Sequence, residues 1–176
     1  VNVCGERRFL GVKGEPGTGK STFLSMQYIY ILRKFYNGDT RYIPFYVDID
    51  VWTKEMLSSV EGVSDIQKVI DWYCVKFSEY LNQVINICCK YKLQPCIIID
   101  GLDCNNMLTY AGHTIEHFYY QMLEEKLKLI GGKYIMGLNT HPNSLAEKSF
   151  EHVDKFQYAC FLNKVFIVPY KDRDHY

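Results

Sequence analysis

The chain has 176 residues, 48% of them hydrophobic and 23% charged, and its 20 Lys and Arg residues balance its 20 Asp and Glu residues. This composition is that of a globular protein and excludes a disordered chain, and the length suits a single domain over 1–176. A formal net charge of zero argues against a domain whose main task is to neutralise a polyanion such as nucleic acid.

Hydropathy and cysteine content indicate the cellular compartment of the protein. No apolar run approaches the ~20 residues needed to cross a bilayer, and the N-terminus does not resemble a signal peptide. The seven cysteines form no C-x-x-C pair, and several lie in apolar segments, which favours reduced core thiols. We therefore expect a cytoplasmic protein. Because the chain begins at Val1 rather than Met, we expect it to be part of a longer protein.

Short β-rich runs alternate with helical stretches along the chain. The segment 21–36 has apolar residues at three- and four-residue steps, 65–90 has a long apolar helical face, and CIIID (96–100) is typical of a strand buried on both faces. In chain order we expect strand 7–13, helix 21–36, strand 42–49, helix 65–90, strand 96–100, helix 113–130, strand 133–138, a helix from Asn143 or Ser144 to about 153, and strand 164–170. This alternation implies crossover connections. We therefore predict an α/β three-layer sandwich with a mainly parallel five-stranded sheet.

The stretch 14–21 matches the pattern G-x-x-x-x-G-K-[ST] in full and lies between a predicted strand and a predicted helix. Glycines here let the backbone curl so that consecutive N–H groups face phosphate oxygens. The lysine supplies a positive charge for the β- and γ-phosphates, the serine hydroxyl can bind Mg²⁺, and the helix adds its positive N-terminal end. The residues predicted to contact the phosphates are Gly14, Glu15, Pro16, Gly17, Thr18, Gly19, Lys20, Ser21 and Thr22.

A carboxylate for the metal is expected at the end of another buried strand, and Asp100 stands there, 80 residues after Lys20. A carboxylate without a partner at the edge of a buried sheet would cost free energy, because it would lose contact with water. We therefore expect Asp100 to hold Mg²⁺ through a water molecule. Asp103, three residues further on, is placed to orient or deprotonate an attacking water. The alternative role for Asp103 is that of a loop-capping aspartate.

Three segments together resemble the P-loop NTPases of the STAND class, which includes the NACHT modules, within the wider AAA+ relatives. These segments are GEPGTGKST (14–22), IIIDGLD (97–103) and YIMGLNTHP (134–142). The resemblance implies an ATPase that binds ATP or ADP with Mg²⁺, and a sensor strand between the cradle strand and the strand ending at Asp100. Asn139 or Thr140 would then contact the γ-phosphate or the lytic water. The implied catalytic residues are Lys20, Asp103, Asn139 and Thr140, and the implied metal ligands are Ser21 and Asp100.

The sequence departs from this family at two positions. His141 stands where Arg is common, and Cys104 stands where an acidic residue is common. Residues 42–172 also contain no arginine, so the arginine-bearing lid of small-molecule kinases and the arginine finger of ring-forming AAA+ proteins are missing there. These features favour a slowly hydrolysing ATP switch, without the family's winged-helix and helical segments, in a multidomain signalling-type protein. Its expected partners are the other domains of the longer chain and further proteins.

Other functions remain open. One is an interaction module in which the nucleotide, such as retained ADP, only completes the fold, and another is an AAA+-like ATPase that acts on nucleic acid. Guanine is disfavoured because Phe166 stands where the N-K-x-D motif needs Asp, so the choice of adenine follows from the resemblance. HTIEH (113–117) matches the H-x-x-E-H pattern of zinc peptidases, which would need His113 and His117 on one helix face. We favour a polar helix face or a partner contact for this segment.

Overall fold

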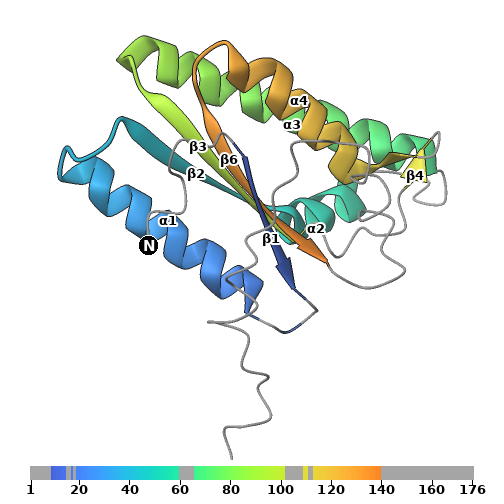
Figure 1. The fold of residues 1–176 in the computed structure, drawn as a ribbon. Coiled ribbons are helices and arrows are strands. Elements are labelled where there is room, and N and C mark those ends of the chain that lie inside the picture. Colours follow the sequence, from blue (N-terminus) through green and yellow to red (C-terminus); the bar gives the residue numbers. More distant parts are fainter. Residues whose placement is uncertain are drawn as a thin grey trace, which may run out of the picture.

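A computed structural model describes residues 9–14, 17, 19–59, 66–101, 109–110 and 113–139. Its described part is an α/β fold with a four-stranded sheet in which every strand pair is parallel, and a separate two-stranded pair (Figure 1). In chain order the elements are β1 (Phe9–Gly14), α1 (Lys20–Tyr36), β2 (Tyr42–Asp48), α2 (Ile49–Ser59), α3 (Ile66–Tyr91), β3 (Gln94–Asp100), β4 (Thr109–Tyr110), β5 (His113–Thr114), α4 (Ile115–Lys128) and β6 (Lys133–Asn139).

The strand order of the main sheet is β1-β6-β3-β2. The last strand of the described residues, β6, therefore lies between β1, which leads into the glycine-rich stretch, and β3, which ends at Asp100. This is the order that the resemblance implied for the sensor strand. The predicted fifth strand over 164–170 and the predicted helix from Asn143 or Ser144 lie outside the described residues. The parallel sheet is confirmed with four strands, and the fifth stays a prediction.

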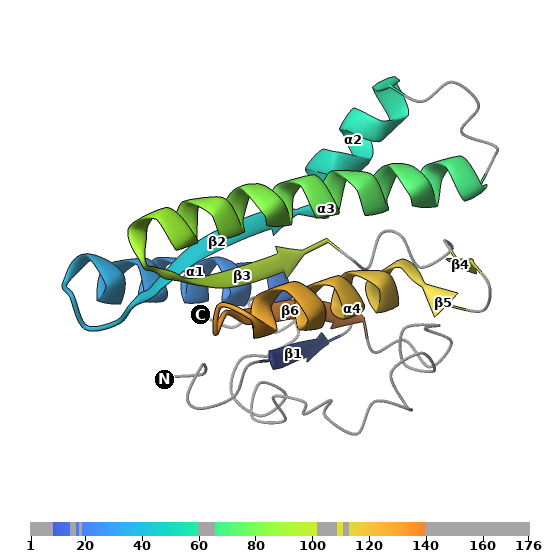
Figure 2. The same ribbon diagram turned by 90° about the horizontal axis from the view of Figure 1, so that it is seen from above.

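Helices cover both faces of the sheet and make three layers (Figures 1 and 2). On one face, α1 packs its buried side chains Phe23, Leu24 and Ile31 against β1, β3 and β6. On the other face, α2, α3 and α4 share a larger core with the opposite side of the strands. Successive side chains of β3 point to opposite faces, so Ile98 belongs to the first core, and Ile97 and Ile99 to the second. A strand buried on both sides is expected to be apolar, and the buried residues 95–99 of β3 are all apolar.

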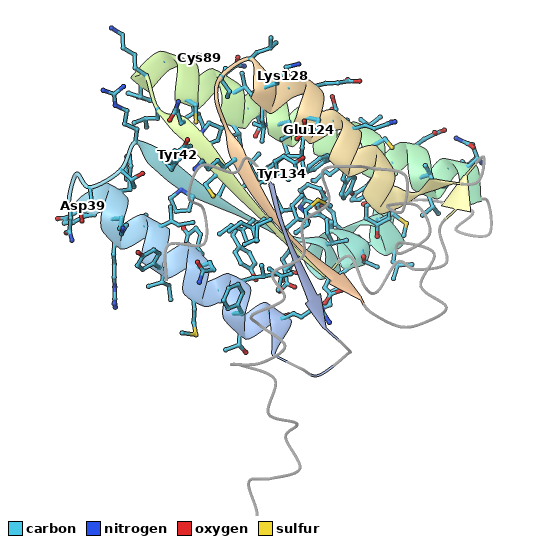
Figure 3. All side chains as sticks on the ribbon, in the orientation of Figure 1. Asp39, Tyr42, Cys89, Glu124, Lys128 and Tyr134 are labelled. Carbon is cyan, nitrogen blue, oxygen red and sulfur yellow. The ribbon has the colours of Figure 1, made fainter. Side chains whose placement is uncertain are left out.

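The long helix α3 follows the predicted amphipathic pattern. Its residues Val69, Ile70, Tyr73, Phe77, Leu81, Val84 and Cys88 are all buried. The ring of Phe77 stacks on that of Tyr119 in α4, with 4.1 Å between centroids, so the two helices are joined by aromatic packing. A hydrogen bond from the Tyr134 hydroxyl to Glu124 ties β6 to α4 on the same face (Figure 3).

Three described elements differ from the sequence-based expectation, namely α2 and the two short strands β4 and β5. The segment after β2 forms α2, which was not predicted, and Ile49, expected to end the strand, begins this helix. The Asp48 carboxylate accepts hydrogen bonds from the backbone N–H groups of Asp50 (2.9 Å) and Val51 (3.4 Å), so it caps the helix immediately after the strand. His113 lies in β5 and α4 begins only at Ile115, so the expectation of one helix carrying both His113 and His117 is wrong.

Among the described residues, no helix is both long enough and apolar enough to pass through a lipid bilayer. The cysteines at 74, 88, 89 and 96 are free thiols, and two of them, Cys88 and Cys96, are buried in the cores. Cys88 and Cys96 are thus the core cysteines that the sequence predicted, whereas Cys89 is exposed and Cys74 is half-buried. Burial raises the pKa of the Cys88 thiol to about 11, so this thiol stays protonated and unreactive at neutral pH.

Candidate functional site

Those predicted site residues that the structure describes lie at one edge of the sheet. Because all four strands are parallel, their carboxyl ends meet at the same edge. Gly14 and Asn139, the last residues of β1 and β6, are register partners, and Asp48 and Asp100, the last residues of β2 and β3, are register partners too. In open parallel α/β sheets, ligands bind beyond this edge.

The glycine-rich stretch joins the end of β1 to the start of α1. Gly17 and Gly19 have φ angles of +80° and +87°, a left-handed backbone that residues with side chains rarely adopt. An added Cβ atom at either position would meet nothing within 4 Å, so the backbone conformation, and not crowding, requires glycine there. Glu15, Pro16 and Thr18 lie outside the described residues. The two described glycines support the prediction that this backbone curls.

Helix α1 begins at Lys20 with Gly19 in its N-cap position. No side chain caps this end, and the first turn carries no acidic residue. The first N–H groups of a helix lack partners within the helix, and the helix dipole adds partial positive charge there. Ser21 and Thr22 are exposed at this end, and Lys20 is half-buried. This end of α1 is therefore suited to an anion such as a phosphate group.

The Asp100 carboxylate, half-buried at the end of β3, accepts three hydrogen bonds. Its Oδ1 atom accepts from the Ser21 hydroxyl at 3.1 Å and from the Gly101 N–H at 2.9 Å. Its Oδ2 atom accepts from the Tyr46 hydroxyl at 2.9 Å. Asp100 lies two residues after Ile98 in β3, and side chains two residues apart in a strand point to the same face. Asp100 therefore lies on the α1 face of the sheet, as Ile98 does. The predicted metal residues Ser21 and Asp100 are therefore in direct contact although they lie far apart in sequence.

Tyr46, on β2, is a site residue that the sequence analysis missed. The pKa of its phenol is raised to about 12, mainly by burial; the hydrogen bond with Ser25 lowers the pKa, and the Asp100 carboxylate raises it as hydrogen-bond acceptor and negative charge. The hydroxyl is thus protonated at neutral pH and donates to Asp100. Tyr46 lies two residues before Asp48, so the alternation of side chains along β2 could have placed Tyr46 on the α1 face. No sequence signal, however, pairs Tyr46 with Asp100.

Two more glycines allow close approach at the site. Gly101 has a φ of +80°, and a Cβ atom there would lie 3.1 Å from the backbone nitrogen of Asp50 at the start of α2. A Cβ atom on Gly137 of β6 would lie 3.0 Å from a methyl group of Leu24 and 3.6 Å from Asp100 Oδ1. Gly137 thus lets α1 lie directly against β6 beside the carboxylate. Neither glycine was singled out from the sequence.

The donor atoms fit a hard divalent cation. A hydroxyl and a carboxylate, both oxygen ligands, are the groups that Mg²⁺ prefers. The Ser21 proton points to Asp100, which leaves the hydroxyl lone pairs for a cation, and Asp100 lies close enough to reach the same ion through one water molecule. The described residues contain no group of three or more His, Cys, Asp or Glu side chains able to hold a metal by themselves. A cation here would therefore need ligands in addition to these described side chains, such as phosphate oxygens and water.

The remaining predicted residues are described only in part. Asn139 ends β6 at the same edge as Gly14, which is the backbone position expected of a sensor residue. Asp103 and Thr140 lie outside the described residues, as do His141 and Cys104. Their roles stay predictions.

No protein-family model matches the sequence, and no curated protein matches it. Among solved structures, that of C. elegans PCH-2 resembles this chain with a TM-score of 0.42 and 14% identity, over 86% of this chain and 35% of PCH-2. The chain thus spans about a third of the length of PCH-2. A TM-score of this size assigns neither a family nor a function, and the resemblance to the STAND class stays a prediction from the sequence motifs.

Proposed function

We propose that this chain binds a nucleoside triphosphate with Mg²⁺ at the edge of the sheet, between the start of α1 and the end of β3. One observation carries the proposal: the hydroxyl of Ser21 lies 3.1 Å from the carboxylate of Asp100, across 79 positions of sequence. The motif at 14–21 predicts a carboxylate for its metal at the end of another buried strand, and Asp100 is the residue expected to supply it. Their contact in the folded chain supports that pairing.

Each half of the site would have its own task. The N–H groups of the glycine-rich stretch and of the first turn of α1 would bind phosphate oxygens, and Lys20 would neutralise the β- and γ-phosphates. Ser21 would bind Mg²⁺ directly, and Asp100 would hold it through water. When bound, Mg²⁺ neutralises phosphate charge and favours attack at the γ-phosphorus.

The proposed activity is slow hydrolysis of ATP. Asp103 would orient or deprotonate the attacking water, and Asn139 or Thr140 would contact the γ-phosphate. The long stretch without arginine leaves no delocalised cation from 42–172 to stabilise the charge of the transition state. A long-lived ATP state suits a switch, in which the γ-phosphate favours one arrangement of the domain relative to its partners. We therefore propose a switch domain of a larger signalling-type protein.

The binding site is tested by Lys20→Ala. Affinity for a fluorescent ATP analogue with Mg²⁺ is expected to fall about 10- to 100-fold, because charge-assisted hydrogen bonds contribute roughly 1.5–3 kcal/mol. Lys34→Ala is the matched control, since Lys34 lies in the last turn of the same helix, over the Tyr30 ring, and should leave binding unchanged. Equal affinity in Lys20→Ala and the wild-type chain would refute the site.

Hydrolysis is tested separately with Asp103→Asn in single-turnover measurements. The variant should bind ATP as the wild-type chain does and lose most of its turnover. If the wild-type chain retains ADP through purification and shows no turnover, the nucleotide is structural and the chain is an interaction module. Competition between ATP and GTP for the same site decides the base, and salt-sensitive binding to DNA would support the nucleic-acid alternative.

A further inference from the structure

We propose that Tyr46 is a positioning residue of the metal site, whose hydroxyl orients the Asp100 carboxylate so that Oδ1 stays directed toward Ser21. This inference rests on the proposed function and goes beyond the nucleotide-binding motif, which contains neither Tyr46 nor any other residue of β2. The inference gives strand β2 a role in the site, although no residue of β2 belongs to the motif.

The carboxylate is held from both of its oxygen atoms. Gly101 N–H and the Ser21 hydroxyl reach Oδ1, whereas among the described residues only Tyr46 donates to Oδ2, at 2.9 Å. The terminal torsion of an aspartate is broad and roughly two-fold, so a carboxylate held at one oxygen alone can rotate. The hydrogen bond at Oδ2 removes that freedom. A cation bound by Ser21 would face Oδ1, so its binding would not require loss of the Tyr46 hydrogen bond to Oδ2.

Tyr46 is itself held in place by α1. Its ring packs edge-on against Tyr28, with 5.9 Å between centroids and an interplanar angle of 84°. Its oxygen lies 3.4 Å from the hydroxyl of Ser25, which is one helical turn after Ser21. Register pairing sets Tyr46 beside Ile98 and two positions before the Asp48–Asp100 pair. One hydroxyl therefore connects the helix that begins at the glycine-rich stretch with the acidic end of β3.

The test is Tyr46→Phe, which removes the hydroxyl and keeps the ring that packs on Tyr28. Binding of a fluorescent ATP analogue is titrated against Mg²⁺, and again in EDTA. The Mg²⁺ concentration that gives half of the metal-dependent gain in affinity should rise about tenfold, as is typical when a residue behind a metal ligand is lost. Affinity in EDTA should stay unchanged, because the phosphate-binding backbone is intact.

Tyr42→Phe is the matched control. Tyr42 lies on the same strand and the same face but at the opposite end, paired with Gln94, and it contacts Lys133 instead of the site (Figure 3). Its Mg²⁺ titration should equal that of the wild-type chain. A Tyr46→Phe titration within twofold of wild type would overturn the inference and leave the proposed function standing. An equal loss of affinity with and without Mg²⁺ would also overturn it, because it would indicate a structural role only. Absence of nucleotide binding by the wild-type chain would instead refute the proposed function, and the inference with it.

Discussion

The two faces of the sheet are built for different purposes. On the side of α3 and α4, buried hydrophobic residues dominate, and they are twice as many as in the core under α1 among the described residues. On the α1 side, polar groups reach the edge of a smaller core: Ser21, Ser25, Tyr46 and Asp100 form one chain of hydrogen-bonding contacts. Both faces share the same strands, so the division follows from the alternation of side chains along each strand.

This comparison indicates that one face supplies most of the stability and the other carries the candidate site. Buried apolar area contributes roughly 25 cal/mol per Å², and a larger core therefore stabilises more. Polar groups at the edge of a core gain little net stability, because their hydrogen bonds replace bonds to water. Substitutions on the α3 face should therefore change unfolding, and those on the α1 face should change ligand binding.

The largest expected effect is on the α3 face. Phe77→Ala removes a fully buried ring that stacks on Tyr119 and should lower the free energy of unfolding by about 3–5 kcal/mol. Urea denaturation measures this loss, and the folded fraction should keep its nucleotide affinity. Val75→Ala on the exposed side of the same helix is the control and should change stability by less than about 0.5 kcal/mol. A nucleotide affinity that falls in the folded Phe77 variant would break the division between the faces.

A smaller effect is expected from adding one methyl group on each face. Gly137→Ala would press on Leu24 under α1, with a contact of 3.0 Å, and Gly132→Ala would press on Leu127 under α4, with a contact of 3.1 Å. Each should cost about 1–3 kcal/mol of stability by overpacking. Of these two glycines, only Gly137 lies beside Asp100. Only Gly137→Ala should therefore weaken Mg²⁺-dependent nucleotide binding, by about tenfold. Equal binding by the two variants would show that the α1 face is not specialised for the site.

The smallest effect is expected at the surface between α2 and α3. Lys76 forms an ion pair with Glu55 at 2.6 Å, and both side chains are partly exposed to water. Lys76→Met should change the free energy of unfolding by less than about 1 kcal/mol, and the change should shrink as salt is added. A double-mutant cycle with Glu55→Gln isolates the pair. A coupling that stays large at high salt would mean that charge, and not only packing, stabilises this face.

Much of the fold follows from patterns that the sequence displays directly. Strands β1, β2, β3 and β6 and helices α1, α3 and α4 lie within a few residues of their predicted bounds, because apolar periodicity and the glycines at their ends are strong local signals. Helix α2 was missed because no glycine or proline separates it from β2. The signal that could have found it is Asp48, a capping residue followed by apolar side chains at Ile49, Trp52 and Met56.

The pairing of Ser21 with Asp100 could be predicted from the sequence, but the residues around this pair could not. Local motifs identify Ser21 and Asp100 because each belongs to a pattern with its own chemistry. Tyr46 belongs to no pattern, since its importance arises from strand order and from the reach of its side chain across to β3. Gly137 is similar, because only the packing of Leu24 against β6 shows why a side chain is excluded there. Contacts made by residues that belong to no motif are the part of the site that local patterns cannot supply.

Gly101, which follows Asp100 at the end of β3, packs closely against helix α2, which lies outside the glycine-rich motif. The main chain after Asp100 lies so close to the first turn of α2 that not even one extra carbon atom fits without displacing it. Because protein interiors are close-packed, two segments in tight contact cannot move independently of each other. Any displacement of the Asp100 turn must therefore be shared by the beginning of α2, whose far side faces solvent at Val51 and Leu57.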